Sequence, residues 1–322
     1  MEEVKGAVII PSYNKAEYLE DCIKSALMQE APFPIYVILS DDGSSDASPS
    51  ICDEYSRYYP ERIVNISSME NMGVAPNVFK CVKYALSIGV THMLMMGCDD
   101  FLCHKDYFCK QVEFLLRHPD CTLSYANGHY IGTNHTLSME LAINKTPNYT
   151  FKYTKINTRK VLVQGDMLLT GSTVYATRFL NGFFEEFATD DAAKDFLAED
   201  LPLVLYYSRF GKFAKCEVDA LAIRDLPESA SRSRDLKKID TFSKSCLQIR
   251  QRFIHLYEND NWYLLRQAED LYQTKMLRRY AKTQPNTYIA MLKKACRVSP
   301  HLLFSKGTFR SVLVYLRNKK KV

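Results

Sequence analysis

Residues 93–100 read Met93-Leu94-Met95-Met96-Gly97-Cys98-Asp99-Asp100, an apolar run that stops at two adjacent carboxylates. A run this short, bounded by glycine, indicates a strand buried on both faces of a parallel sheet. In an open parallel sheet the ligand crevice lies beyond the carboxyl ends of the strands, so both acids fall where a ligand would bind. Because neighbouring carboxylates repel each other unless a cation or a proton relieves them, a divalent metal ion carrying a phosphate is a natural occupant.

A second apolar run ends in the same way. Residues 36–40 run directly into Asp41-Asp42-Gly43-Ser44-Ser45-Asp46. Taken alone, this segment is equally well an ordinary turn, since Asp, Gly and Ser are common loop residues. Acids at the ends of two strands favour a shared site, and we expect both clusters to line one crevice.

Strands alternate with helices along the first 130 residues. Apolar strands are expected at residues 7–10, 36–40, 62–67 and 93–96, with amphipathic helices between them. We expect Asn14 to cap the first helix, with Glu17 completing a capping box. The alternation predicts an α/β fold with a doubly wound, mostly parallel sheet. No GxGxxG follows the first strand and no GxxxxGK[ST] occurs, which disfavours a dinucleotide fold and a P-loop NTPase.

The pattern weakens after residue 130. Residues 131–170 are polar and lack clear periodicity, and we expect a meander or loops over the crevice there. A strand with a glycine break is expected over residues 168–175. Glu199 and Asp200 stand at the start of a helical pattern. One interpretation of this pair is purely structural, since the helix dipole favours carboxylates at an N-terminus.

Charge divides the chain into two regions. Residues 232–322 hold 21 Lys and Arg against 6 Asp and Glu, a balance of +15, whereas residues 1–231 carry −10. We therefore predict two regions with different partners, residues 1–231 and a basic helical region over residues 232–322. After Asp270 the chain has 13 basic residues and no acid.

The last stretch, residues 301–322, combines an apolar face with an entirely basic polar side. This pattern is typical of an interfacial helix drawn to anionic lipid. The alternative is a terminal helix packed on the domain with a solvated basic tail. Nucleic acid is disfavoured because the apolar residues are mainly aliphatic and offer no stacking platform.

With no secretory signal and no apolar run of roughly 18 residues, we expect a cytoplasmic protein, peripheral at the inner face of the membrane, with its ten cysteines reduced.

Five segments, in this order, resemble motifs of the family 2 glycosyltransferases, a large inverting group with the A-type nucleotide-sugar fold. The segments are 8–14 (VIIPSYN), 40–46 (SDDGSSD), 71–77 (NMGVAPN), 97–100 (GCDD) and 199–200 (ED). Each motif is short, but their common order is specific. The resemblance spans residues 4 to about 231 and implies that residues 1–231 form a nucleotide-sugar-binding and catalytic domain with the A-type fold. The helical pattern of the apolar residues from Ser233 onward predicts that a helical C-terminal region follows it.

Site residues follow from this resemblance. It implies a nucleotide site formed by Pro11, Tyr13, Asn14, Asp41, Asp42, Asn71, Gly73 and Cys98. Asp99 would hold Mn²⁺ or Mg²⁺ on the diphosphate, and Asp200, with Glu199 beside it, would be the general base. We expect the donor and acceptor pocket to include Asp100, Gly171, Ser172, Arg224 and Ser229.

Two departures from the family pattern affect the metal site. Gly97 stands where the first acid of the DxD motif would be, and Leu226 stands where the family often places a histidine ligand. Asp225 could substitute for that histidine. Alternatively, Asp99, water and phosphate hold the ion between them.

Together these features predict a glycosyltransferase that passes a sugar from a nucleotide donor, expected to be a UDP-sugar, to a hydroxyl with inversion. The expected acceptor is a glycan or a lipid-linked saccharide, as in surface polysaccharide synthesis, and an anionic membrane surface is a further expected partner. The alternative is a non-catalytic nucleotide-sugar-binding subunit. A nucleotidyltransferase is disfavoured because residues 11–15 do not form a glycine-rich triphosphate loop.

Overall fold

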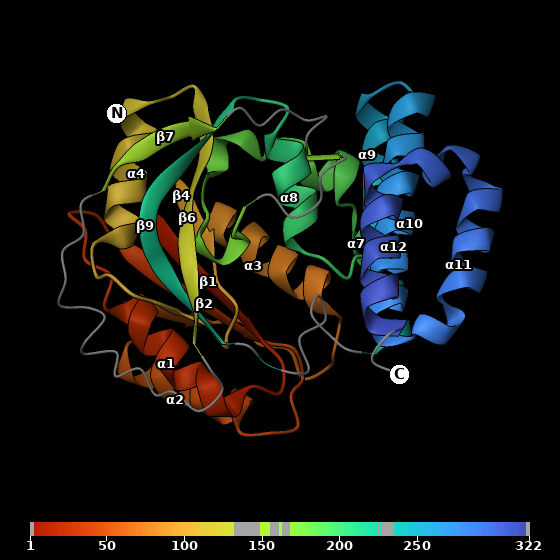
Figure 1. Cartoon of the computed structure of the whole chain (residues 1–322). Helices are drawn as coiled ribbons and strands as arrows, with labels where there is room; N and C mark the ends of the chain where they lie inside the picture. Colours follow the sequence, from red (N-terminus) through yellow and green to blue (C-terminus); the bar gives the residue numbers. More distant parts are fainter. Residues whose placement is uncertain are drawn as a thin grey trace. The chain divides into compact units, whose positions relative to one another are not determined.

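A computed structural model describes residues 3–131, 149–154, 161–162, 168–224, 226 and 235–319. The chain divides into two compact units (Figure 1). The N-terminal unit comprises residues 1–158 and 166–225, and the C-terminal unit comprises residues 159–165 and 226–322. Ser229 and Asp225 lie outside the described residues, as does most of the segment in which loops are expected.

The N-terminal unit is built on a single sheet of nine strands among the described residues. Their order is β3-β2-β1-β4-β8-β6-β9-β5, with β7 paired to β9. The strands are β1 Gly6–Ser12, β2 Ile35–Asp41, β3 Ile63–Asn65, β4 His92–Met95, β5 Phe101–Leu102, β6 Cys121–Ile131, β7 Phe151–Thr154, β8 Val174–Ala176 and β9 Lys212–Arg224.

Parallel pairing dominates the first half of this sheet. Strand β1 pairs with β2 and β4, and β2 pairs with β3, all in parallel. Strand β8 then runs antiparallel to both of its neighbours, β4 and β6, while β6 and β9 are parallel. The expected α/β fold with a mostly parallel sheet is confirmed.

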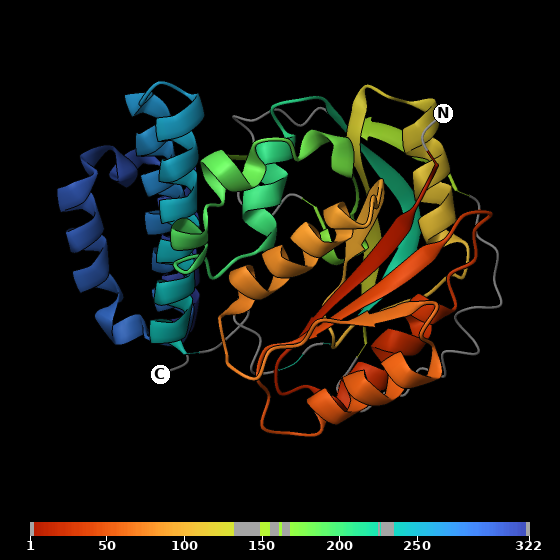
Figure 2. The ribbon, with the colours of Figure 1, turned by 180° about the vertical axis from the view of Figure 1, so that it is seen from behind.

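Helices cover both faces of the sheet (Figures 1 and 2). Alternate residues of β1 and β2, such as Val8 and Val37, form one core with the inward stripes of α1, α2 and α4, and α3 packs on the other face of β1 and β2. The helical segments are α1 Ala16–Leu27, α2 Ser48–Tyr58, α3 Val74–Ser87, α4 Tyr107–Arg117, α7 Asp190–Ala193 and α8 Asp200–Tyr207, with short turns η1 Thr170–Ser172, η2 Thr177–Phe179 and η3 Phe183–Phe187.

Two local predictions were wrong. Of the strand with a glycine break expected over residues 168–175, only the end is a strand: residues 170–172 form the 3₁₀ turn η1, and β8 begins at Val174. The capping box at Asn14 does not form: Lys15 is the N-cap of α1 and makes no side-chain capping bond. Asn14 adopts φ 51°, and its Oδ1 accepts hydrogen bonds from the backbone N and the hydroxyl of Ser45, which directs it away from the helix.

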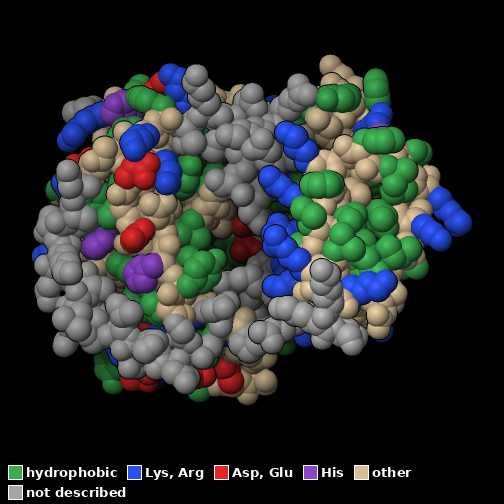
Figure 3. All heavy atoms as spheres, in the orientation of Figure 1, with side chains coloured by type: hydrophobic (Ala, Val, Ile, Leu, Met, Phe, Trp, Pro, Cys, Tyr) green, Lys and Arg blue, Asp and Glu red, His purple; other side chains and the backbone are tan. Residues whose placement is uncertain are grey.

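The C-terminal unit is helical in its described residues. It comprises α9 Leu236–Tyr257, α10 Trp262–Thr283, α11 Pro285–Val298, the 3₁₀ turn η4 Pro300–Phe304 and α12 Lys306–Lys319. Leu277, Tyr288 and Leu302 lie in its core, against which Val312 and Tyr315 of α12 pack. Figure 3 shows hydrophobic side chains gathered over α11 and α12, with Lys and Arg side chains beside them.

None of the described helices combines the length and the apolarity that crossing a membrane requires. All ten cysteines lie in the described residues and none forms a disulfide.

Candidate active site

The loops that follow β1, β2 and β4 open at one edge of the sheet. Strand β1 lies between the other two, with Ser12 opposite Asp41 and Ile9 opposite Met95. The carboxyl ends of neighbouring parallel strands are where α/β sheets bind ligands. The two acidic clusters that the sequence places after β2 and β4 are therefore separated by one strand.

Asp41 is fully buried and holds the loop after β2 in place. Its carboxylate accepts hydrogen bonds from the hydroxyls of Ser12 (3.0 Å) and Ser44 (2.5 Å) and from the backbone N of Ser44 (2.8 Å). A buried carboxylate with several donors is satisfied without a ligand. Asp41 was predicted to bind the nucleotide, but the structure shows its carboxylate buried and engaged with protein donors.

Asp42 joins this loop to the turn that precedes α3. Its two carboxylate oxygens accept hydrogen bonds from the backbone N of Met72 (2.9 Å) and of Gly73 (3.0 Å). Gly43 lies against the same turn, since a Cβ there would stand 2.9 Å from the backbone N of Asn71. The structure therefore brings together Asp42, Asn71 and Gly73, which are far apart in the sequence.

Tyr13 and Cys98 connect the ends of β1 and β4. The Tyr13 side chain is 49% exposed, while Cys98 is buried and Pro11 half-buried. Burial raises the pKa of the Cys98 thiol, and the negative charge of Asp99 acts in the same direction, against a hydrogen bond from the Tyr13 backbone. Cys98 is thus a neutral, buried thiol, and Tyr13 offers a ring on the surface of the predicted nucleotide site.

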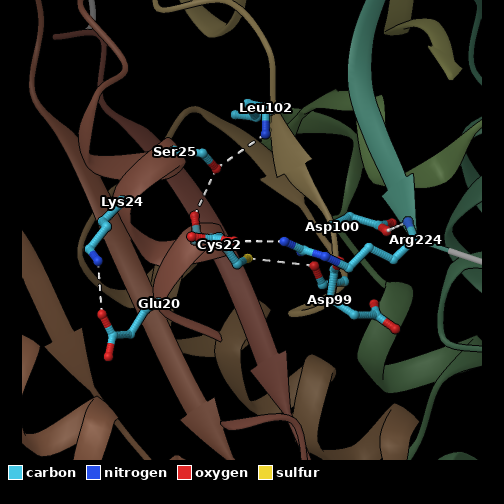
Figure 4. A network of polar contacts seen from close by, with 10 residues as sticks. Glu20, Cys22, Lys24, Ser25, Asp99, Asp100, Leu102 and Arg224 are labelled. Atoms are coloured by element: carbon cyan, nitrogen blue, oxygen red, sulfur yellow. Dashed lines mark hydrogen bonds and ion pairs between the residues drawn. The ribbon is translucent and has the colours of Figure 1, made fainter. Parts of the chain in front are cut away.

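Arg224, the last residue of β9, anchors the acidic loop after β4 to α1 (Figure 4). Its guanidinium donates hydrogen bonds to the backbone O of Asp99 (2.8 Å) and to the carboxylate of Asp21 (2.6 Å). Its backbone N donates to the carboxylate of Asp100 (3.1 Å). Arg224, which was predicted to line the donor and acceptor pocket, is only 5% exposed and holds Asp21, Asp99 and Asp100 together.

Glu199 and Asp200 begin α8, and η1 lies beside them. The hydroxyl of Thr170 donates a hydrogen bond of 2.8 Å to Asp200 Oδ2. The next residue, Gly171, approaches the other acidic loop, since a Cβ there would lie 3.9 Å from Asp100 Oδ2. Residues 170–171 therefore stand between a carboxylate from the end of β4 and one from the start of α8.

Glu199 and Asp200 are adjacent carboxyl groups, and burial and mutual repulsion disfavour the ionised form of Glu199. Burial, and then the negative charge of Asp200, raise the pKa of Glu199 to about 7. A buried carboxyl whose pKa is raised in this way is common at functional sites. Ser172 next to Gly171 is fully buried, and its hydroxyl bonds to the backbone of Ala126 and Leu169, so it supports the turn from below.

The donor atoms at Asp99 fit a divalent ion only partly. Within the described residues no three His, Cys, Asp or Glu side chains come together as a metal-binding group. The Asp99 side chain is 28% exposed, and its Oδ2 lies 3.7 Å from the ammonium of Lys15. Mg²⁺ is often held by one or two carboxylates plus substrate phosphates. The donor set therefore fits an ion that arrives with a diphosphate, and does not form a protein-only cage.

One protein family matches the N-terminal half of the chain. The model of glycosyl transferase family 2 matches residues 7–172, which is slightly more than half of the chain. The chain belongs to glycosyl transferase family 2. The matched residues include the loops after β1, β2 and β4 as well as η1, and they end before Glu199 and Asp200.

Relatives resemble this family 2 chain over different lengths. The uncharacterized protein Mb1547 of Mycobacterium bovis is 36% identical over 119 residues, which is 37% of this chain and 34% of that relative. The minor teichoic acid biosynthesis protein GgaA of Bacillus subtilis is 45% identical over 69 residues, 21% of this chain and 15% of GgaA. The glycosyltransferase GlyG of Streptococcus pneumoniae is 25% identical over 270 residues, 79% of this chain and 86% of GlyG. The matches thus span about a third or less of the first two relatives.

Solved structures share the fold at low sequence identity. TarS of S. aureus has a TM-score of 0.56 at 14% identity, with 97% of this chain and 54% of TarS covered. The mannosyltransferase PcManGT from Pyrobaculum calidifontis, solved with GDP-Man and Mn²⁺, has a TM-score of 0.52 at 13% identity, covering 98% of this chain and 87% of that enzyme.

Sequence reasoning missed three residues of the site. Lys15 contacts Asp99, Thr170 binds Asp200, and Asp21 pairs with Arg224. A single lysine, threonine or aspartate forms no pattern of its own. Only the position of Lys15, directly after the 8–14 motif, could have drawn attention to it.

Proposed function

We propose that this chain transfers a sugar from a nucleotide donor, a UDP-sugar, to a hydroxyl of a glycan or lipid-linked acceptor with inversion, as in surface polysaccharide synthesis. One observation carries the proposal: carboxylates from the end of β4 and from the start of α8 flank the same two residues, Thr170 and Gly171. Sugar transfer from a nucleoside diphosphate needs a cation that neutralises the negative charge of the leaving diphosphate on one side of the sugar, and a base that takes the proton of the acceptor hydroxyl on the other.

The donor is assigned from the loops and the relatives. The exposed ring of Tyr13 and the Asp42–Gly73 contact offer an aromatic face and a hydrogen-bonding edge for a nucleotide base. TarS has been solved with UDP-GlcNAc and PcManGT with GDP-Man. We assign UDP because the 40–46 loop resembles the uridine-binding loop of the family.

Asp200 is the proposed base. Thr170 fixes the carboxylate of Asp200 with a hydrogen bond, and burial together with the charge of Asp200 raises the pKa of the neighbouring Glu199. A carboxylate held in this way can remove the proton of an acceptor hydroxyl as the sugar transfers. A single base and a single displacement give inversion. A bound Mn²⁺ or Mg²⁺, held by Asp99, would neutralise the charge that develops on the departing diphosphate.

Release of nucleotide from a panel of UDP-, GDP- and TDP-sugars with Mn²⁺ and a glycan acceptor tests the proposal. We expect one UDP-sugar to be turned over. Gly97, in place of an acid, favours the alternative of a non-catalytic nucleotide-sugar-binding subunit. That alternative requires saturable binding of a nucleotide sugar with no release of nucleoside diphosphate under any condition of the panel.

The acceptor is proposed to be lipid-linked because of a surface on the C-terminal unit, which we name the apolar stripe. It consists of Leu303, Phe304, Phe309, Leu313 and Leu316, all exposed, and Phe304 is 92% exposed. The last three have the i, i+4, i+7 spacing of one face of α12. Lys306, Arg310 and Arg317 fall on the adjoining face of the same helix, so the surface complements an anionic bilayer at the inner face of the membrane.

Sedimentation with vesicles tests this membrane partner. The double variant Phe304→Ser/Phe309→Ser should bind vesicles of anionic and zwitterionic lipid at least about 10-fold more weakly than the wild-type chain, because two rings no longer enter the bilayer. Trp262→Ser, which removes another exposed aromatic of the same unit, is the matched control. Equal sedimentation of all three proteins rejects the membrane proposal, and concentration-dependent self-association lost in the double variant would assign the stripe to a second copy of the chain.

A further inference from the structure

Lys15 carries a positive charge at the place where the metal ion is expected. It follows the turn at the end of β1 and is the N-cap of α1. Its backbone is fixed on both sides: the N–H donates to the hydroxyl of Ser48 (3.2 Å), and the carbonyl accepts from the backbone N of Tyr18 (3.0 Å) and Leu19 (3.1 Å). The ammonium must therefore act within reach of this anchored position.

The side chain of Lys15 turns inward from that anchor. It is 17% exposed, and its Nζ lies 3.7 Å from Asp99 Oδ2 and 5.8 Å from the centre of the Tyr18 ring. Two geometric observations, the ion pair and the ring contact, thus hold the lysine over the acidic loop.

An ammonium at this distance competes with a divalent ion for the carboxylate. Two cations a few ångströms apart repel each other, and the repulsion is strongest where solvent is partly excluded. A diphosphate reverses the balance, because its oxygens can accept from the lysine while its charge draws the metal ion to Asp99. Lys15 therefore disfavours metal alone and favours nucleotide.

We propose that Lys15 is a built-in counter-cation of Asp99, which makes binding of the divalent ion depend on the nucleotide and which then contacts the diphosphate. This inference rests on the proposed function and deepens it. Arg224 cannot do the same work, because its guanidinium is already directed to Asp21 and to the backbone of Asp99 beneath the site.

Binding measurements on the full chain test the inference without turnover. Calorimetry would determine the Kd of Mn²⁺ alone, of UDP alone and of UDP with saturating Mn²⁺, for wild type, Lys15→Met and Lys15→Arg. Lys24→Met is the matched control, since Lys24, like Lys15, forms an ion pair with a carboxylate. Its partner is Glu20 of α1, at 2.8 Å (Figure 4). Circular dichroism and a thermal melt would check that each variant is folded.

We expect opposite changes in the two single-ligand constants of Lys15→Met. Mn²⁺ alone should bind about 5-fold more tightly and UDP alone about 10-fold more weakly, whereas Lys15→Arg and Lys24→Met should stay within about 2-fold of wild type. Constants of Lys15→Met that match those of Lys24→Met overturn the inference but leave the proposed function standing. A wild-type chain that binds none of UDP, GDP and TDP, with or without Mn²⁺, overturns both.

Discussion

The loop after β2 and the loop after β4 carry the same residue type at the same edge of the sheet, yet their carboxylates have different partners. Asp41 and Asp42 accept hydrogen bonds mainly from backbone N–H groups and serine hydroxyls of neighbouring loops. Asp99 faces the ammonium of Lys15, and Asp200 faces the hydroxyl of Thr170. We expect this difference in partners to distinguish the acids that hold the loops in place from the acids that take part in the proposed reaction.

The largest effect is expected at the start of α8. Asp200→Asn should lower the rate of sugar transfer at least about 10³-fold, because an amide cannot take the proton of the acceptor hydroxyl. Binding of the nucleotide should persist, since the predicted nucleotide residues lie in other loops. Initial rates of nucleotide release and a calorimetric Kd for UDP measure the two quantities.

Asp191→Asn is the control for this variant, because Asp191 is an exposed acid of α7 that pairs with Lys194. It should keep the wild-type rate. If Asp200→Asn lost UDP binding together with activity, Asp200 would belong with the acids that build the site, and the distinction between the two groups would fail.

The next largest effect is expected on the free energy of unfolding, which should fall more for a variant of the loop after β2 than for a variant of the loop after β4. Asp41→Ala should lower the free energy of unfolding by about 3 kcal/mol, because it leaves the buried hydroxyl of Ser12 and the donors of Ser44 without their acceptor. Asp99→Ala removes a partly exposed ion pair and should cost less than about 1 kcal/mol. Urea unfolding of both variants measures this, and equal losses would mean that Asp99 is also structural.

The strands that lead into the site were predictable because their sequences are locally decisive. Strands β1, β2 and β4 are short apolar runs stopped by polar turns, and the structure finds each within a few residues of its predicted bounds. Strand β9 was missed, although exposed Glu217 and Asp219 alternate with buried Val218 and Ala220, the period-two pattern of a strand. Its pairing with β6, far away in the chain, leaves no trace in either sequence.

The partners of the site residues were not predictable for the same reason. Ser12 lies 29 residues from Asp41, and Arg224 lies 125 residues from Asp99. The acids themselves could be found because they recur at strand ends, but which of them are saturated depends on loops that meet only in three dimensions. The 40–46 motif therefore could not show that the carboxylate of Asp41 is already hydrogen-bonded to Ser12 and Ser44.

A smaller effect, dependent on pH, is expected at Glu199. Its pKa is raised from an ordinary value near 4.5 to about 7, first by burial and then by Asp200, so the folded state holds the proton more tightly than the unfolded state. The stability from this group is complete below about pH 4.5 and is lost as the pH rises through 7. Glu199→Gln has no proton to lose. Its free energy of unfolding relative to wild type should thus rise by about 2 kcal/mol between pH 5 and pH 8.

Urea titrations at the two pH values measure that difference. Glu185→Gln, at an exposed glutamate of the same unit, is the matched control and should show no such rise. If the difference in free energy of unfolding between Glu199→Gln and wild type were the same at pH 5 and pH 8, the pKa of Glu199 would not be raised. Glu199 and Asp200 would then belong with the structural acids.

The smallest effect is expected at Asp46, the last acid of the loop after β2 and an exposed one. Its carboxylate accepts from the backbone N of Ala16 at the start of α1 and of Ser48 at the start of α2, each at 2.9 Å. Burial acts to raise its pKa, but these hydrogen bonds outweigh burial and lower it.

The stability that Asp46 contributes is therefore present above its ordinary pKa and is lost as the pH falls through the lower pKa of the folded state. Asp46→Asn keeps one acceptor but loses the charge at two helix N-termini, so it should cost about 1 kcal/mol at pH 7 and almost nothing near pH 2. A loss that persisted at acid pH would show that Asp46 acts through shape alone, and that even the exposed acid of this loop is a purely structural residue.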